Sequence, residues 1–325
     1  MKKILFVFFL FSLVLCGCQN KEVVQTPHDD TMDSLLVEAR DYWIYHQDNG
    51  EFMVVEKLSG KCYPLLNNPL VPREIRQSVG QCKVFENKVY YILVNAQGIR
   101  TIECIDLDTG VRQTIYEEPS QSTEIVAFGV KIWEPPVSFR QIIPNTLSNF
   151  VFSEGNLILL RNEAICLLER GRESVVYEGS YRQFTCDGSR LFLEDAEGVL
   201  CQVEGNTGKL HRFEHIYPAQ LTSYDGQLFF FDKGSGDGIY TLDFSTGQKK
   251  LLVPGSWKVF RVNGGRILAQ DSKGALILYD LEGKFTKELE HNQEYVDFYL
   301  TNDGSTVVFT IRQPNGKFSY SPICL

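Results

Sequence analysis

The stretch Tyr224–Val253, YDGQLFFFDKGSGDGIYTLDFSTGQKKLLV, predicts three β-strands joined by two turns that contain glycine. The Asp225-Gly226 pair at its start is a strong hairpin signal, because a two-residue turn that matches the twist of its strands needs positive φ. The run Leu228–Phe231 contains no polar residue, which indicates a strand buried on both faces. Together with the expected strand Ala219–Ser223 just before it, the stretch makes one four-stranded antiparallel unit.

The same unit recurs along the chain with a nearly constant period. The glycines of its first turn are Gly155, Gly188, Gly226, Gly264 and Gly304. Their spacings are 33, 38, 38 and 40 residues, and Asn87 and Asp41 mark two earlier, degenerate copies. Such a period with four strands per repeat is typical of propeller blades. We therefore predict an all-β chain folded as a β-propeller of four-stranded antiparallel blades, seven in number, with six as the alternative if the first copy is not a blade.

The predicted propeller domain covers residues 34–325 and has two long crossovers between blades. The blades are Leu35–Leu66, Gln81–Tyr116, Asn149–Tyr177, Tyr181–Phe213, Ala219–Val253, Lys258–Leu289 and Tyr295–Leu325. The insertion Asn67–Gly80 contains two prolines, which argue against a central strand. The insertion Glu117–Ser148 is either an extra hairpin or a long loop. The last blade supplies only three strands, so we expect Met32–Val37 to add its outer strand and close the ring.

Residues 1–17 have the pattern of a targeting segment. Lys2 and Lys3 precede the apolar run ILFVFFLFSLVLC, which is shorter than the ~20 residues that a membrane-spanning helix needs. The run ends in LCGC at residues 15–18, which resembles the lipobox of bacterial lipoproteins. This resemblance implies a lipoprotein signal peptide that is cleaved after Gly17, and a diacylglycerol on Cys18. A plain secretory signal or an uncleaved anchor is the alternative.

Acylation at Cys18, with palmitate-type chains, would hold the chain on the extracytoplasmic face of the cell membrane, because two or more acyl chains suffice for stable anchoring. In a cell with an outer membrane that face would look into the periplasm. Residues 18–33 are polar and lack a periodic pattern, so we expect them to form a tether.

The third turn of the repeat resembles that of a known group of propellers. Its sequences DLDTG, NTGK and DFSTG, at Asp106–Gly110, Asn206–Lys209 and Asp243–Gly247, are similar to the D-x-x-T-G turn of quinoprotein-type repeats. The aspartate of such a turn can accept backbone N–H groups. The Trp that docks each blade on the next in that family is absent, and Ile115, Phe213 and Leu252 or their neighbours stand in its place. The resemblance therefore implies the repeat layout of TolB-like and quinoprotein-like propellers, without a quinone or any other cofactor.

The chain is acidic, with 32 Lys+Arg against 41 Asp+Glu. Loss of residues 1–17 would remove two lysines and no acid, which leaves 30 against 41 and a formal charge of −11. An acidic excess disfavours nucleic acid as a partner and direct attraction to anionic lipid. We expect a monomer.

Seven cysteines follow Cys18, and an odd number excludes a complete disulfide framework. Cys104, Cys166 and Cys201 stand at equivalent third-strand positions among apolar neighbours, which indicates buried small hydrophobic residues. A pairing of Cys186 with Cys201 is left open.

Motifs for metals and catalysis are weak. His211 and His215 have metal-like spacing, and the sequence from Asp232 to Gly238 faintly resembles a calcium loop, but neither pattern has the further ligands that such a site needs. We expect no metal site and assign no catalytic residue.

Two functions fit these features. The first is a membrane-anchored binding or scaffolding module for a protein or glycan partner. The alternative is an enzyme that acts on an extracytoplasmic polymer, a glycan hydrolase or lyase with carboxylates at the mouth of the channel. Convergence of two or three acids with perturbed pKa at that mouth would favour the enzyme.

We predict that the ligand binds on the face that carries the two insertions, because loops longer than a connection requires often serve recognition. Trp133, Phe139 and Arg140 are the candidate binding residues, since these residue types dominate binding hot spots. The alternative is that the two aromatic side chains pack on blade three or cap the channel.

Overall fold

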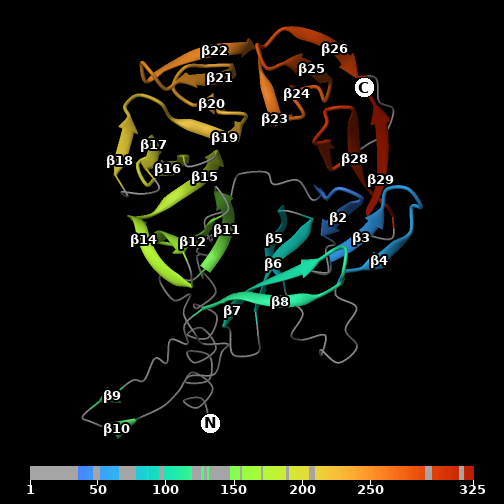
Figure 1. Ribbon diagram of the computed structural model, residues 1–325. Coiled ribbons are helices and arrows are strands. Elements are labelled where there is room, and N and C mark those ends of the chain that lie inside the picture. The colour runs from blue at the N-terminus through green and yellow to red at the C-terminus, as the bar shows by residue number, and fades with distance from the viewer. Residues whose placement is uncertain are drawn as a thin grey trace, which may run out of the picture.

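The chain forms a ring of antiparallel β-sheets around a central axis (Figure 1). The computed structural model describes residues 36–46, 52–65, 78–85, 87–94, 99–118, 126–127, 130–131, 147–153, 156–169, 171–187, 190–204, 209–289, 295–314 and 318–325. In these ranges all regular structure is β, and no helix has the length and apolar character needed to cross a membrane. Seven sheets make up the ring, which confirms the predicted propeller and decides for seven blades rather than six.

Each blade consists of strands that follow one another in the chain, numbered from the axis outward. Blades one and two contain β1 (Leu36–Glu38), β2 (Tyr42–His46), β3 (Phe52–Glu56) and β4 (Cys62–Pro64), then β5 (Ser78–Phe85), β6 (Lys88–Val94), β7 (Arg100–Asp106) and β8 (Arg112–Glu117). Blades three and four contain β11 (Leu147–Ser153), β12 (Asn156–Arg161), β13 (Ala164–Glu169) and β14 (Arg172–Glu178), then β15 (Tyr181–Asp187), β16 (Arg190–Asp195), β17 (Leu200–Glu204) and β18 (Leu210–Phe213).

The remaining blades continue this order. Blades five and six contain β19 (Pro218–Tyr224), β20 (Gln227–Asp232), β21 (Gly238–Asp243) and β22 (Gln248–Pro254), then β23 (Trp257–Asn263), β24 (Arg266–Asp271), β25 (Leu276–Asp280) and β26 (Phe285–Leu289). Blade seven contains β27 (Asp297–Leu300), β28 (Thr306–Arg312) and β29 (Phe318–Cys324).

Two predicted blade starts move toward the N-terminus by two residues or more. β5 begins at Ser78 and β11 at Leu147, both earlier than the predicted starts at Gln81 and Asn149, and the register of β5 shifts between Val79 and Lys83. Such a shift marks an irregular edge that the alternating pattern does not reveal.

The insertion after β8 carries the short strands β9 (Val126–Ala127) and β10 (Val130–Lys131), which pair antiparallel. The hairpin alternative for this insertion is therefore confirmed. Residues 67–77, 119–125, 128–129 and 132–146 of the two insertions lie outside the described residues.

The middle strands are buried on both faces because blades stack face to face. In β20, Phe229 belongs to the apolar cluster shared with blade six, while its neighbour Phe230 belongs to the cluster shared with blade four. Both side chains are fully buried. The outer strand of the same blade, β22, is mostly exposed. The prediction that the apolar run Leu228–Phe231 is a strand buried on both faces is therefore confirmed.

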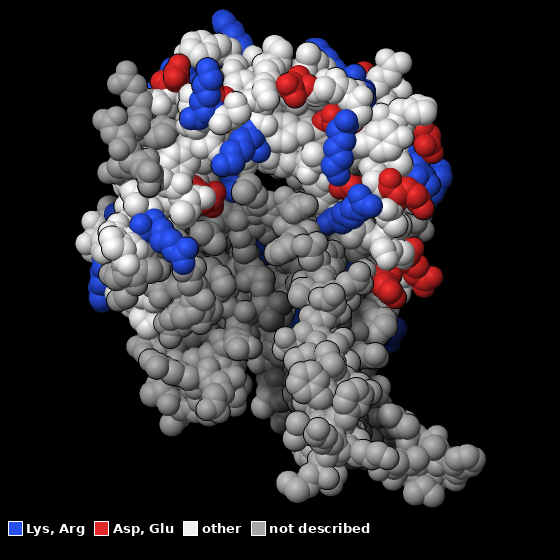
Figure 2. Space-filling view, turned by 180° about the vertical axis from the view of Figure 1, so that it is seen from behind, with Lys and Arg blue, Asp and Glu red and all other residues white. Residues whose placement is uncertain are grey.

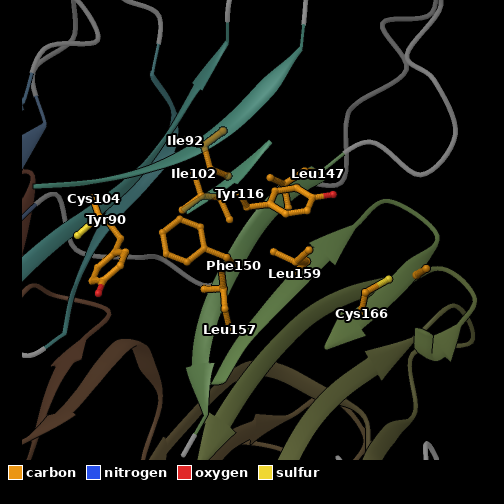
Figure 3. Packing of buried hydrophobic residues seen from close by; sticks show 11 residues of the cluster. Tyr90, Ile92, Ile102, Cys104, Tyr116, Leu147, Phe150, Leu157, Leu159 and Cys166 are labelled. Atoms are coloured by element: carbon orange, nitrogen blue, oxygen red, sulfur yellow. The ribbon is translucent and has the colours of Figure 1, made fainter. Parts of the chain in front are cut away.

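The hydrophobic core is divided into seven clusters, one at each junction between neighbouring blades. Figure 3 shows the junction of blades two and three, where Ile102 and Tyr116 of blade two face Phe150 and Leu159 of blade three. Each blade thus buries the apolar faces of its two neighbours, as repeat architectures require.

Among the described residues, the junction that closes the ring, between blades seven and one, has the fewest buried apolar residues, Tyr45 and Val308. The rings of Tyr45 and Tyr320 lie 4.4 Å apart, and the backbone N–H of Asn302 donates to Glu38 Oε2 at 2.7 Å. Side-chain packing between the two blades joins the ends of the ring.

The predicted closure by Met32–Val37 is wrong for the part of that segment that the structure describes. Leu36 and Val37 belong to β1, which pairs with β2 as the innermost strand of blade one, and the described residues of blade seven form three strands. A tight turn, in which Ala39 N donates to Tyr42 O, connects β1 to β2. Pairing across so short a connection costs little loop entropy, which favours it over pairing with a distant blade.

The aspartates of the third turns bind backbone as predicted. Asp106 Oδ1 accepts hydrogen bonds from Thr109 N at 2.9 Å and Asp108 N at 3.1 Å, and Asp243 Oδ1 accepts one from Ser245 N at 2.8 Å. The N–H and hydroxyl of Thr109 lower the pKa of Asp106, and the hydroxyl and N–H of Ser245 lower that of Asp243.

Phe213 and Leu252 occupy the docking position that Trp holds in quinoprotein-type repeats. A Cβ added at Gly247 would touch the ring of Phe213, and one added at Gly283 would clash with the carbonyl oxygen of Leu252. In these two cases the outer strand packs on the third-turn glycine of the following blade, whereas a Cβ added at Gly110 or Gly171 would meet no atom within 4 Å. Apolar side chains smaller than Trp can make this contact between blades, because the glycine lets the two backbones approach closely.

The third-strand cysteines are buried as predicted, with Cys104 on β7, Cys166 on β13 and Cys201 on β17. Burial raises the pKa of the Cys166 and Cys201 thiols to about 12. Cys186 and Cys201 form no disulfide. They stand opposite different residues of β16, Leu191 and Leu193, and Cys201 Sγ donates to Asp195 Oδ2 at 3.5 Å.

Candidate functional site

A cavity of about 400 Å³ lies on the axis of the ring. Its lining comes from the first strands of six blades, β5, β11, β15, β19, β23 and β27, mostly from their carboxyl-terminal halves. These strands contact one another around the axis. In an antiparallel blade the first strand ends at the first turn, so the cavity lies toward the face that carries the first and third turns.

One ring of equivalent positions supplies much of the lining. In each of blades two to six, the first and second strands have a last pair of residues before the turn that joins them, such as Tyr224 and Gln227 in blade five. The residue two places before that last paired residue of the first strand lines the cavity in all five blades. These five residues are Lys83, Val151, Thr185, Thr222 and Arg261. Because they occupy the same register in their blades, their side chains start at similar depth in the channel.

Two of these residues are cationic and stand nearly across the channel from each other. Lys83 belongs to blade two and Arg261 to blade six, so in a ring of seven they are separated by two blades on one side and three on the other. Arg261 Nη2 donates to Asp297 Oδ1 at 2.9 Å, and its guanidinium lies 5.8 Å from the centre of the Phe298 ring. The ion pair fixes the side chain of Arg261 at the wall.

Most polar side chains of the lining are satisfied by the protein. Gln220 Nε2 donates to Phe260 O at 2.6 Å, and Asn263 Nδ2 donates to Leu300 O at 2.9 Å. The hydroxyl of Thr185 lies 2.8 Å from that of Ser223. Each of these bonds joins one blade to the next. The polar groups of the wall therefore hold neighbouring first strands together.

The rest of the wall is apolar or aromatic. Phe152, Phe184 and Tyr299 line it with aliphatic side chains of the same strands. Burial raises the pKa of Tyr299, which stays protonated near neutral pH and whose hydroxyl donates to Asn302 Oδ1 at 3.0 Å. The lining combines two cations with apolar surface, and none of the described residues that line the cavity is Asp or Glu.

Figure 2 shows one face of the molecule, hollowed at the centre of the ring. Lys and Arg side chains stand around the described part of the rim, with Asp and Glu side chains between and beyond them. For a chain with more acids than bases, the bases near the opening are a local concentration of positive charge.

The buried acids of the described residues lie elsewhere, and each is paired with a base. They are Glu103 with Arg112, Glu194 with Lys233 and Arg182, Asp195 with Arg212, and Asp232 with Lys249. Burial alone would raise the pKa of Asp232, but hydrogen bonds from Lys249, Ser235 and the Tyr217 N–H hold it below its ordinary value. These carboxylates fasten strands and blades together.

The two weak metal-like patterns of the sequence make other contacts in the structure. Asp232, at the start of the faint calcium pattern, is bound to Lys249 and to Tyr217 N at 2.9 Å, and the ring of His211 lies 4.6 Å from that of Phe213. Across the part of the chain that the structure describes, no three His, Cys, Asp or Glu side chains are grouped to hold a metal ion.

Four predicted site residues lie outside the described residues, namely Cys18, Trp133, Phe139 and Arg140. Their roles stay predictions. Lys83 and Arg261 are not among the residues predicted from the sequence. An alignment of the repeats on their first turns would place Lys83 and Arg261 at the same position of their blades. The first turn of blade two, at Asn87, lacks the usual glycine, so its position in that alignment is clear only from the pairing of Phe85 with Lys88.

No family model and no curated protein matches the chain. Solved structures do share its fold. A structure of YCF48 bound to D1 peptide matches 85% of this chain and 90% of that chain at 12% identity, with a TM-score of 0.56. A prolyl endopeptidase matches 91% of this chain and 50% of that one at 12% identity, with a TM-score of 0.60. TolB from Acinetobacter baumannii matches 89% of this chain and 75% of that chain at 14% identity, with a TM-score of 0.48. At these identities the likeness is one of fold.

Proposed function

We propose that the chain is a membrane-anchored, extracytoplasmic binding module that holds a segment of a partner protein in the cavity on its axis. The observation that carries this proposal is the cavity itself, with cations on opposite walls and apolar surface between them. Its volume lies in the range of about 300–1,000 Å³ that is usual for ligand sites. A propeller of similar fold, YCF48, was solved with the D1 peptide, which supports a peptide as the ligand class.

The enzyme alternative receives less support. Glycan hydrolysis needs two carboxylates at a set separation. Among the described residues no Asp or Glu lines the cavity, and the buried acids are neutralised by Arg or Lys at other places. We therefore favour binding over catalysis, by a monomer that needs no nucleic acid partner.

Anchoring through Cys18 is part of the proposal and rests on the LCGC sequence. In bacterial cells fed a clickable fatty acid, the wild-type chain is expected to carry the label and the Cys18→Ala variant to lose it. Cys16→Ala is the matched control and should keep the label. Equal labelling of wild type and Cys18→Ala would contradict the anchor.

The partner site is tested by filling the cavity. Thr222→Phe introduces a ring into the space between the first strands, while Gln248→Phe makes a similar change on the exposed strand β22. The full chain is cross-linked in membranes, and the captured proteins are compared by mass spectrometry. We expect wild type and Gln248→Phe to capture the same partner protein, and Thr222→Phe to capture at least tenfold less of it. The melting temperature of both variants should equal that of wild type.

A partner that Thr222→Phe retains would contradict binding in the cavity. The double variant Trp133→Ala with Arg140→Ala, run beside it, tests the insertion face. Loss of the partner from that variant alone would assign binding to the insertion.

A further inference from the structure

We propose that the cavity recognises an acidic peptide segment, with a side-chain or terminal carboxylate held between Lys83 and Arg261 and an apolar side chain against the aromatic wall. This inference rests on the proposed function and names the chemistry of its ligand. Three features of the lining carry it.

The first feature is charge. Lys83 and Arg261 occupy equivalent positions on the first strands of blades two and six, so they approach the axis from nearly opposite sides. The bonds of Arg261 to Asp297 and to Phe298 O use Nη2 and Nε, and a guanidinium has five N–H donors in all. An anionic group on the axis can thus be met from both sides, and charge-assisted hydrogen bonds are about twice as strong as neutral ones.

The second feature is that the neutral polar groups are already committed. Gln220 exchanges hydrogen bonds with both the carbonyl and the N–H of Phe260, and Asn263 binds Leu300 O, Asn302 and Gly264 N. A glycan offers many hydroxyl groups, each of which needs a hydrogen-bond partner when buried. This wall has few such partners to give, so it suits a peptide better than a sugar.

The third feature is the apolar surface beside the cations. Phe152 and Phe184 come from adjacent blades, and Tyr299 comes from the blade after Arg261. These rings can bury an aliphatic or aromatic side chain of the peptide, and burial of apolar surface favours binding. An acidic residue next to an apolar one matches both parts of the lining.

The test uses a displayed library of random seven-residue peptides and the full chain purified from membranes. Peptides are selected on wild type and counter-selected on Thr222→Phe, whose cavity is filled. We expect the cavity-dependent peptides to be enriched in Asp and Glu. Lys83→Gln should weaken a selected peptide about tenfold and remove the enrichment, since a factor of ten corresponds to one charge-assisted bond.

Two control variants test whether the effect depends on the positive charge of Lys83 in the cavity. Lys83→Arg should keep the preference for acids, and Lys250→Gln removes the same charge from the exposed strand β22 and should change nothing. Cavity-dependent peptides without acidic enrichment would overturn this inference and leave the proposed function standing. If no peptide separates wild type from Thr222→Phe, and sulfated or uronic-acid glycans on an array do, the ligand is a glycan and the peptide class is wrong.

Discussion

Replacement of Gly264 by alanine is expected to lower the free energy of unfolding by about 3 kcal/mol or more. The loss has two causes, because the new Cβ overpacks the contact between blades and because a side chain is strained at positive φ. Gly264, in the first turn of blade six, has φ of +53°, and a Cβ there would overlap the backbone of Gly304 in the first turn of blade seven. Neither backbone can yield without moving one blade against the other. The urea midpoint of the full chain is the measurement.

The next residue provides the matched control. Gly265 also has positive φ, at +71°, but a Cβ there would meet no atom within 4 Å. Gly265→Ala should therefore cost only the conformational term, about 1 kcal/mol. Equal losses for the two variants would show that the contact between the blades contributes nothing.

Replacement of Arg161 by leucine is the second change with a large expected effect. Arg161 is buried at the junction of blades two and three, where Nε lies 2.8 Å from Glu173 Oε1, Nη1 lies 3.0 Å from Glu118 Oε1, and Nη2 donates to the Tyr116 hydroxyl at 2.6 Å. Burial alone would lower the pKa of Arg161, but the oxygens of Glu173, Tyr116 and Glu118 raise it. Removing the cation takes away the ion pairs that Arg161 makes with Glu118 and Glu173.

Loss of one partner of a buried ion pair costs about 3–5 kcal/mol, and because Glu173 is partly exposed we expect the lower end, about 3 kcal/mol. Arg172→Leu is the control, since Arg172 is exposed at the start of β14 and should change the free energy of unfolding by less than about 0.5 kcal/mol. The double change Arg161→Leu with Glu173→Leu should recover part of the loss. If Arg161→Leu unfolds at the wild-type urea concentration, the network has no net role in stability.

Much of the fold could be predicted because propeller blades repeat their local signals. Turns such as Asp225-Gly226 and Thr246-Gly247 and the apolar run Leu228–Phe231 specify strand ends and burial within a few residues, independently of distant parts of the chain. The third-turn hydrogen bonds of Asp106 and Asp243 are equally local, and they form as predicted. The degenerate copies at Asp41 and Asn87 still mark blades, because a strand pattern survives the loss of a glycine.

The candidate site could not be predicted in the same way. Lys83 and Arg261 are far apart in the sequence, and only the closed ring brings them to one cavity. Sequence reasoning directed attention to the insertions, where long loops and aromatic residues are visible, whereas the cavity is built from short strands whose lining residues look ordinary.

The amino-acid sequence by itself determined the strand pattern of the repeat and the burial of the middle strands, since these follow from turns and apolar runs that act over a few residues. The choice of seven blades over six came from the structure. The tertiary structure alone decided how the ring closes and what faces its axis. Leu36 and Val37 pair with the neighbouring strand β2 because the connection is short, and the junction with blade seven depends on contacts between Tyr45 and Tyr320, at opposite ends of the chain. Such contacts depend on the blades' relative placement, which no local pattern encodes.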